Sequence, residues 1–258
     1  MLITFPYNQS DFPPVDVLDG NLLGVFEPRA SDPVPDVRAC VLEAIENPIG
    51  APTIEELAQG KKRALILSDD YTRQTPVDVI IPILEQKLRS AGIEEIRILV
   101  ALGTHRAMTE QEKLDRFGPD ICSRFEIINH EYKNPDALVE LQGRDCKSRP
   151  NGDARPISNR FAVNKAVLDA DLVIGLGQIA PHRIAGYSGG AKIVLPGISG
   201  AEGIARTHWI GGKEDGEKML GFANNPVRDA MNECARLAGL CFIVNAICDP
   251  EGNLIGMV

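Results

Sequence analysis

Four histidines are present in the sequence, and three of them lie in polar segments beside other reactive side chains. These segments are Gly103-Thr104-His105-Arg106, Ala180-Pro181-His182-Arg183 and Arg206-Thr207-His208-Trp209, and each is predicted to be a loop. Histidine moves protons near neutral pH, and its neutral imidazole binds transition metals. His105, His182 and His208 are therefore candidate acid–base or metal-binding groups, whereas His130 is interpreted as a structural residue.

A second reactive cluster, Asp70-Tyr71-Thr72-Arg73, directly follows an apolar run. It combines a carboxylate, hydroxyl groups and a guanidinium. The planar guanidinium of arginine can hold a substrate carboxylate through two parallel hydrogen bonds, which lysine cannot do. The spacing alone is equally compatible with a helix N-cap and an exposed salt bridge.

The segment Pro181 to Lys192 is the richest in glycine and in reactive groups. Its glycines let backbone amides approach an anion closely, and Lys192 could contact a phosphate or act as a nucleophile. The segment does not match the Walker A motif, because Ala191 precedes the lysine and Ile193 follows it. No Gly-x-Gly-x-x-Gly sequence opens a helix either, so the common nucleotide-binding motifs are disfavoured.

Three predicted strands precede these polar segments. Arg63 to Leu67 and Ile96 to Leu102 are apolar runs separated by a helical pattern from Val77 to Ala91, which predicts a right-handed βαβ unit. Asp171 to Leu176 is a third buried strand. Because the carboxyl ends of parallel strands line a ligand crevice, residues 70–73, residues 103–106 and the segment from Gly177 onward are expected to converge.

The remaining pattern predicts an α/β fold: a Rossmann-like domain with a parallel sheet and a small N-terminal antiparallel element. The antiparallel element is expected from strands at Leu2 to Tyr7 and Leu22 to Glu27. Further helices are expected at Asp36 to Glu46, after Thr53, from Thr109 to Gly118-Pro119, where the helix is expected to end, and at Ala162 to Leu168. A strand is expected at Phe125 to Asn129 and a β-hairpin from Phe242 to Val258. The polar residues from Asn134 to Gly152 are expected to form a small excursion from the sheet.

Composition excludes some classes of function. The formal net charge of -9 argues against non-specific binding to nucleic acid or to anionic membranes, which need a basic surface. The six cysteines form no Cys-x-x-Cys pair, so reduced and mostly buried thiols are expected. The first residues do not resemble a signal peptide and no apolar run is long enough for a membrane span, which predicts a cytoplasmic protein.

Three motifs occur in one order: Asp-x-Thr-Arg at 70–73, Leu-Gly-Thr-His-Arg at 102–106, and Pro-His-x-x-Ala-Gly-Tyr-Ser-Gly-Gly-Ala-Lys at 181–192. Together with His208, they resemble the nickel-pincer lactate racemase family of 2-hydroxyacid racemases and epimerases, over most of the chain. The resemblance implies a nickel(II) pyridinium-3,5-bisthiocarboxylate mononucleotide bound covalently to Lys192. It also implies that His208 is the fourth nickel ligand, and a square-planar nickel(II) ion with sulfur donors and one imidazole is chemically reasonable.

The resemblance further implies a role for each reactive segment. Residues expected to contact the cofactor are Asp70, Tyr71, Thr72, Arg73, Ser188, Gly189 and Gly190, besides Lys192. Arg73 is expected to face the carboxylate of the substrate. His105 and His182 are expected to form an acid–base pair: one takes the hydroxyl proton as the α-hydride moves to the cofactor, and the other returns a proton after the planar 2-oxoacid has turned.

The resemblance implies that residues 1–258 are the N-terminal catalytic and cofactor-binding domain. A C-terminal domain with further substrate contacts is expected but missing, and the apolar end of the chain favours a truncation. The expected partners are a small anionic 2-hydroxyacid, whose identity stays open, and the enzymes that synthesise the cofactor. A host without those enzymes is expected to yield the protein without cofactor, and the isolated domain could be inactive.

Two other classes of function are compatible with the residues. A zinc-dependent hydrolase could use His105, His182 and His208 as ligands, but Lys192 and the Ser188-Gly189-Gly190 segment would then have no role. A non-catalytic module could hold a ligand that carries a phosphate. A covalent adduct on Lys192 favours the racemase, zinc without an adduct favours the hydrolase, and neither favours the binding module.

Overall fold

The computed structural model describes residues 1–4, 13–26, 29–142 and 160–258, which form two compact units, Met1–Ser31 and Asp32–Val258. In the first unit, β1 (Leu2–Ile3) pairs antiparallel with β2 (Val15–Asp16), and the 3₁₀ turn η1 (Asp19–Asn21) follows. An N-terminal antiparallel element was predicted correctly, but its second strand was placed wrongly. Residues 22–26 form no strand, and Leu23 and Phe26 are exposed without a sheet to cover them.

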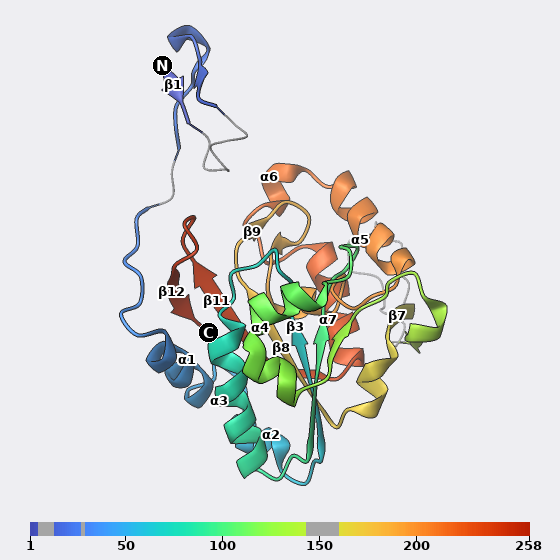
Figure 1. Cartoon of the computed structure of the whole chain (residues 1–258). Coiled ribbons are helices and arrows are strands. Elements are labelled where there is room, and N and C mark those ends of the chain that lie inside the picture. The colour runs from blue at the N-terminus through green and yellow to red at the C-terminus, as the bar shows by residue number, and fades with distance from the viewer. Residues whose placement is uncertain (5–12, 27–28, 143–159) are drawn as a thin grey trace. The chain divides into compact units, whose positions relative to one another are not determined.

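The second unit is built on a six-stranded sheet in the order β12-β11-β8-β3-β4-β5 (Figure 1). The strands are β3 (Arg63–Ser68), β4 (Glu95–Val100), β5 (Ile127–Asn129), β8 (Leu172–Gln178), β11 (Leu240–Cys248) and β12 (Leu254–Met257). Neighbouring strands are parallel except β11 and β12, which form the predicted C-terminal hairpin. The chain runs outward from β3 to β5 and then crosses to β8, so the strand order reverses between β3 and β8. The predicted α/β fold with a mainly parallel sheet is confirmed.

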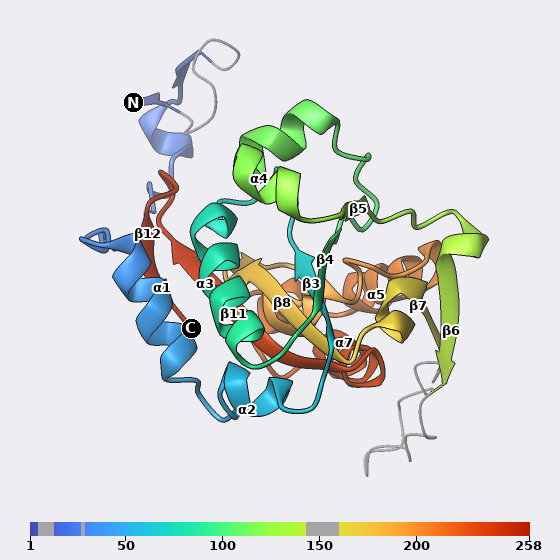
Figure 2. The ribbon, with the colours of Figure 1, turned by 60° about the horizontal axis from the view of Figure 1, so that its bottom comes forward.

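Both faces of this sheet are covered (Figure 2). One face packs against α1 (Val37–Glu46), α2 (Ile54–Ala58), α3 (Val77–Ser90) and α4 (Glu110–Arg124). The other packs against the 3₁₀ turn η4 (Gly190–Ile193), α5 (Ala201–Lys213), α6 (Gly216–Met219) and α7 (Pro226–Leu237). In β3, Ile66 faces the first layer and Leu65 and Leu67 face the second. Burial on both sides explains why these strands are continuous apolar runs.

The predicted capping boxes are present at Thr53 and Thr109. Gly118-Pro119, however, does not end α4 as expected: the helix kinks at Gly118 and continues to Arg124. Proline is favoured in the first turn of a helix, so Pro119 starts the second segment instead of closing the first. Phe117 and Ile121, on the two sides of the kink, are both buried in the same core.

The helix predicted at Ala162 to Leu168 was wrong. Residues Arg160–Asn164 form strand β7, which pairs antiparallel with β6 (Leu138–Gln142), and a 3₁₀ turn η3 (Lys165–Asp169) follows. Phe161 and Val163 alternate into the core beneath this pair, so the segment has a period of two residues. In the predicted polar excursion, residues 135–137 form the 3₁₀ turn η2 and residues 138–142 form β6, whereas residues 143–152 lie outside the described part.

Among the described residues, no helix is both long and apolar enough to cross a membrane.

The kink in α4 yields a stability prediction. Gly118 has φ 80° and ψ 156°, a conformation that essentially only glycine adopts. We expect Gly118→Ala to destabilise the protein by about 1–3 kcal/mol. Gly212→Ala is the matched control, because a methyl group there meets no atom within 4 Å and α5 is an ordinary helix at that position; it is expected to stabilise by about 0.5–1 kcal/mol. Urea unfolding monitored by circular dichroism measures both, and equal effects would contradict the backbone explanation.

Candidate active site

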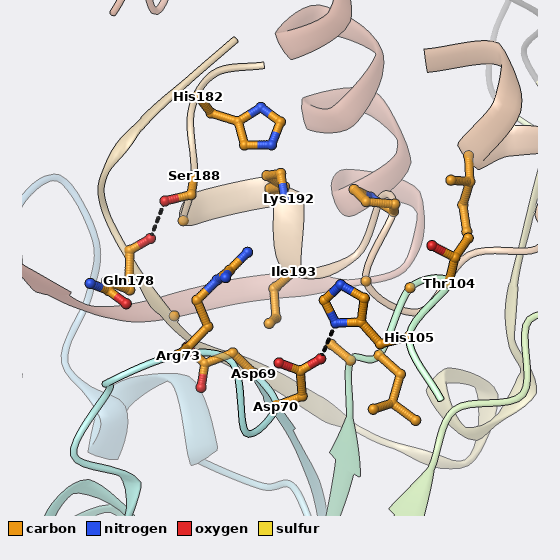
Figure 3. A pocket seen from close by; sticks show the side chains of 18 of the residues that line it. Asp69, Asp70, Arg73, Thr104, His105, Gln178, His182, Ser188, Lys192 and Ile193 are labelled. Atoms are coloured by element: carbon orange, nitrogen blue, oxygen red, sulfur yellow. Dashed lines mark hydrogen bonds and ion pairs between the residues drawn. The ribbon is translucent and has the colours of Figure 1, made fainter. Parts of the chain in front are cut away.

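A cavity of about 220 Å³ lies at the carboxyl ends of β3, β4 and β8, where the strand order reverses. Such a reversal is the usual ligand site of an open parallel sheet. The cavity is lined by eight of the predicted site residues. Figure 3 labels Asp70, Arg73, His105, His182, Ser188 and Lys192. The other two are Gly189 and His208. The structure therefore brings together the three strand ends that the sequence analysis expected to converge.

The loop after β3 is folded around the carboxylate of Asp70, which is only 3% exposed. Thr72 donates to it twice, from its backbone nitrogen at 2.9 Å and from its hydroxyl at 2.6 Å, and His105 Nδ1 contacts the other oxygen. Burial alone would raise the pKa of Asp70, but these hydrogen bonds hold it below its ordinary value. Asp70 is thus an anion that orients His105. It does not cap a helix, since α3 begins only at Val77.

Tyr71 does not line the cavity. Its ring lies beneath the guanidinium of Arg106, 4.9 Å from the ring centre, and its side chain is exposed. Thr72 and Gly190 are also not among the residues that line the cavity. A cofactor-contacting role for these three residues stays a prediction.

Arg116 and Asp69 form a buried ion pair that the sequence analysis missed; each side chain is 9% exposed. Arg116, on α4, donates to the Asp69 carbonyl at 3.1 Å and to the Arg73 carbonyl at 2.8 Å, so it fixes both ends of the loop that carries Asp70. Burial raises the pKa of Asp69 to about 6, although Arg116 and Thr75 oppose the rise. No sequence pattern signals this role, because Arg116 reads as one of many charges on an amphipathic helix.

Lys192 lies in η4 and enters the cavity opposite Arg73 (Figure 3). Burial, and then the positive charges of Arg73 and Arg228, lower its pKa to about 8. At pH 8 about half of this amine is therefore uncharged and nucleophilic, far more than of an ordinary lysine. The neighbouring Ser188 hydroxyl is occupied, since it donates to the Gln178 carbonyl at 2.6 Å and accepts from the Ala180 nitrogen at 2.8 Å.

The glycine segment before Lys192 lies directly against β11. A side chain at Gly189 would come within 2.8 Å of the Asn245 amide oxygen, and the φ of 70° there favours glycine. Asn245 also accepts from the Gly190 nitrogen at 3.3 Å. Arg228, on α7, was missed from sequence: its guanidinium donates to the carbonyls of Gly189, Ala185 and Tyr187 and so holds the segment in place.

His208 lies on α5 and not in a loop, which corrects the prediction. The glycines around it suggested a loop, but α5 continues through them to Lys213, and Gly211 allows close packing: a side chain there would come within 2.6 Å of Ile184. Its Nδ1 lies 2.8 Å from the carbonyl oxygen of Ile204. A carbonyl can only accept, so Nδ1 carries the proton and Nε2 carries a free lone pair. That is the usual state of a metal-ligating histidine.

His182 is held differently. Its Nδ1 accepts from the backbone nitrogens of Ile184 at 3.2 Å and Ala185 at 3.1 Å. Burial, and then the positive charges of Lys192 and Arg73, lower its pKa to about 4. His130, interpreted as structural, is buried and bonded to the Ser199 carbonyl and the Asn164 amide, which confirms that interpretation.

Two further expectations concern metal-binding residues and thiols. Within the described part of the chain, no group of three or more His, Cys, Asp or Glu side chains is arranged to hold a metal ion, so the three histidines do not form a zinc site. The five cysteines that the structure describes are free, but only Cys234 is buried; the expectation of mostly buried thiols was wrong. Cys146 lies outside the described residues.

The fold and cavity define a Rossmann-like α/β domain with its functional groups at the carboxyl edge of a parallel sheet. The family model of the lactate racemase N-terminal domain matches residues 7–219, and the chain belongs to that family. It is 36% identical to a lactate racemase of Lactiplantibacillus plantarum over 84% of this chain and 49% of that protein. It is 31% identical to a lactate racemase of Thermoanaerobacterium thermosaccharolyticum over 98% of this chain and 58% of that protein.

A solved structure of the lactate racemase apoprotein from Thermoanaerobacterium thermosaccharolyticum matches with a TM-score of 0.78 and 30% identity, over 95% of this chain and 55% of that one. This confirms the family resemblance of the three motifs and the fold class. The chain spans about half the length of the curated relatives it matches, 49% and 58% respectively.

The Asp69–Arg116 pair can be tested by stability. Arg116→Met removes one partner and leaves the Asp69 carboxylate buried, so we expect a loss of about 3–5 kcal/mol at pH 8. Arg124→Met, in the same helix, is the control: Arg124 pairs with Glu85 and Asp120 near the surface, and its loss should cost about 1 kcal/mol or less. Urea unfolding measures both variants, and similar losses would show that the buried pair has no special weight.

The lowered pKa of His182 predicts a pH dependence. Below pH 6.5 the unfolded chain protonates this histidine, whereas the folded protein does not until about pH 4. The stability that neutral His182 contributes is therefore present above pH 6.5 and is lost as the pH falls toward 4. The difference in unfolding free energy between the wild type and His182→Gln should shift against the wild type between pH 7.5 and 4.5. A difference that does not change with pH would refute the lowered pKa.

Proposed function

We propose that this chain is the catalytic, cofactor-binding domain of a 2-hydroxyacid racemase or epimerase. The observation that carries the proposal is the single cavity that collects Arg73, His105, His182, Lys192 and His208. Membership of the lactate racemase N-terminal domain family supports the same reaction class. Lactate is one possible substrate, and the residues that would select among 2-hydroxyacids are expected in part in a second domain.

The cavity suits a nickel-pincer nucleotide in three respects. Lys192 presents an amine with a pKa near 8, as a covalent attachment requires. His208 presents an Nε2 lone pair, because its other nitrogen is bonded to the Ile204 carbonyl. Gly189, which lines the cavity, has no side chain in the way of an anionic group. When bound, the cofactor would supply a reversible acceptor for the α-hydride of the substrate.

The protein's own groups would bind the substrate and move its hydroxyl proton. Arg73 provides a guanidinium for the carboxylate of the 2-hydroxyacid. His105, oriented at Nδ1 by the Asp70 anion, has Nε2 free to take the hydroxyl proton, and His182 lines the cavity as its acid–base counterpart. Racemisation requires the hydride to return to the opposite face of the planar 2-oxoacid. After that 2-oxoacid has turned, its oxygen lies near the other histidine, which is why two proton-handling groups are needed.

Co-production with the cofactor-synthesis enzymes tests the proposal. We expect nickel and a covalent adduct on Lys192, measured by metal analysis and by mass spectrometry of peptides. Lys192→Arg should keep the charge but lose the adduct, whereas Lys218→Arg, with a largely exposed side chain, should retain it. Zinc without an adduct would favour a hydrolase. Neither metal nor adduct would leave a non-catalytic module and overturn the proposal.

A further inference from the structure

The three histidines of the cavity are held by different partners at the same ring atom. At His105, Nδ1 contacts the carboxylate of Asp70, and at His208, Nδ1 lies 2.8 Å from the Ile204 carbonyl oxygen. Both partners accept hydrogen bonds. At His182, Nδ1 faces two donors, the backbone N–H groups of Ile184 at 3.2 Å and Ala185 at 3.1 Å.

These partners determine which ring nitrogen carries the proton. A neutral imidazole has one N–H and one lone pair, so a nitrogen that accepts from two amides must hold the lone pair. The proton of His182 is then on Nε2. For His105 and His208 the opposite holds, because Nδ1–H donates and the lone pair is on Nε2. A second proton on His182 would have to go to Nδ1, directly against the two amide N–H groups.

The amides that fix His182 belong to a tightly packed turn between β9 (Pro181–His182) and β10 (Gly186–Tyr187). Ala185 is fully buried, and its carbonyl accepts from Asn225 at 3.2 Å and from Arg228 at 3.3 Å. A side chain at Gly186 would come within 1.9 Å of the Phe222 carbonyl oxygen. The turn therefore cannot move away from the ring without disturbing α7 and the segment before it.

We propose that His182 is held as the neutral Nε2–H tautomer and serves the substrate as a hydrogen-bond donor. Of the pair His105 and His182, only His105 then presents an Nε2 lone pair that can accept the hydroxyl proton. The catalytic meaning of this assignment rests on the proposed racemase function, but the ring state itself does not. A neutral imidazole that donates to a developing oxyanion is an effective electrophile. His182 becomes a base only after its ring has released both amides.

The two faces of the substrate are consequently unequal. For the enantiomer whose hydroxyl group faces His105, the base needs no rearrangement. The Asp70 carboxylate, in contact with His105 Nδ1, stabilises the imidazolium that forms. The other enantiomer requires a rearrangement at residues 182–185 first. The resemblance implies that His105 and His182 are equivalent acid–base groups. The structure favours a different arrangement, in which His105 is the base and His182 is a hydrogen-bond donor that can act as a base only after its tautomer has changed.

Nuclear magnetic resonance of the ¹⁵N-labelled chain, without cofactor or substrate, tests the ring states. With only four histidines, long-range ¹H–¹⁵N spectra can be assigned from His105→Gln, His182→Gln and His208→Gln. We expect His182 to show a protonated Nε2 and an unprotonated Nδ1 at pH 7.5, and His105 and His208 to show the reverse. A protonated Nδ1 at His182, or averaged shifts at both nitrogens, overturns the proposal. Neither result depends on whether the protein is a racemase.

A second measurement tests the donor role in cofactor-loaded protein that includes the second domain. The reference reaction is the half-reaction of the enantiomer whose hydroxyl group faces His105, identified as the one that His105→Ala blocks. It is followed as the loss of α-deuterium from that enantiomer in a single turnover. His182→Ala should slow it by about 10²–10³-fold, as expected for the loss of one oxyanion donor. His182→Gln keeps an N–H near the Nε2 position and should recover about tenfold or more of that loss. Equal losses in the two His182 variants would overturn the donor role, whereas an inactive wild type would count against the proposed function.

Discussion

The parallel pairing of β3 with both β4 and β8 is the constraint on which the site depends. Ser68 lies opposite Val100 on one side, and Leu67 lies opposite Gly175 on the other. This register brings the three strands to an end at nearly the same level, so that the loops after them face one another. The chain passes from β5, on one side of β3, to β8, on the other side. The loops after β3 and β8 therefore diverge and leave a crevice between the carboxyl ends of these two strands. The strand order therefore determines where the cavity lies, and the side chains determine what it can bind.

The electrostatics of the cavity oppose those of the whole molecule. The chain carries a formal charge of -9, yet Arg73, Lys192 and Arg228 gather around the cavity. Burial first, and then the charges of these cations, lower the pKa of His182 to about 4. Because these cations are partly desolvated, they act on one another more strongly than they would in water. An anionic ligand relieves their repulsion. The site is therefore built to bind a carboxylate or a phosphate group, and net charge alone would not have indicated this.

Sequence patterns predicted β3, β4 and β8 and their order along the chain, because a strand buried on both faces leaves an uninterrupted apolar run. They also predicted Asp70, His105 and Lys192 as neighbours, because parallel strands end at one edge. They failed where a residue's role depends on a distant contact. Gly211 read as a loop residue, but in α5 it lies against Ile184, which is distant in the sequence. Arg116 and Arg228 likewise act through backbone carbonyls far away in the chain. No spacing rule reveals such contacts.

Asp69 and Asp70 show how the fold assigns different chemistry to adjacent residues of one type. Both side chains are buried, but they point in different directions from the end of β3. Asp69 meets Arg116 and Thr75, and burial still raises its pKa to about 6. Asp70 receives three hydrogen bonds, from Thr72 and His105, and its pKa falls below the ordinary value. The first carboxylate therefore holds the loop, and the second, favoured as an anion by its hydrogen bonds, orients His105 through Nδ1. Opposite shifts in neighbouring carboxyl groups are a mark of such a division of roles. The division requires the β3 end to be fixed from both sides, by α4 at Asp69 and by the loop after β4 at Asp70.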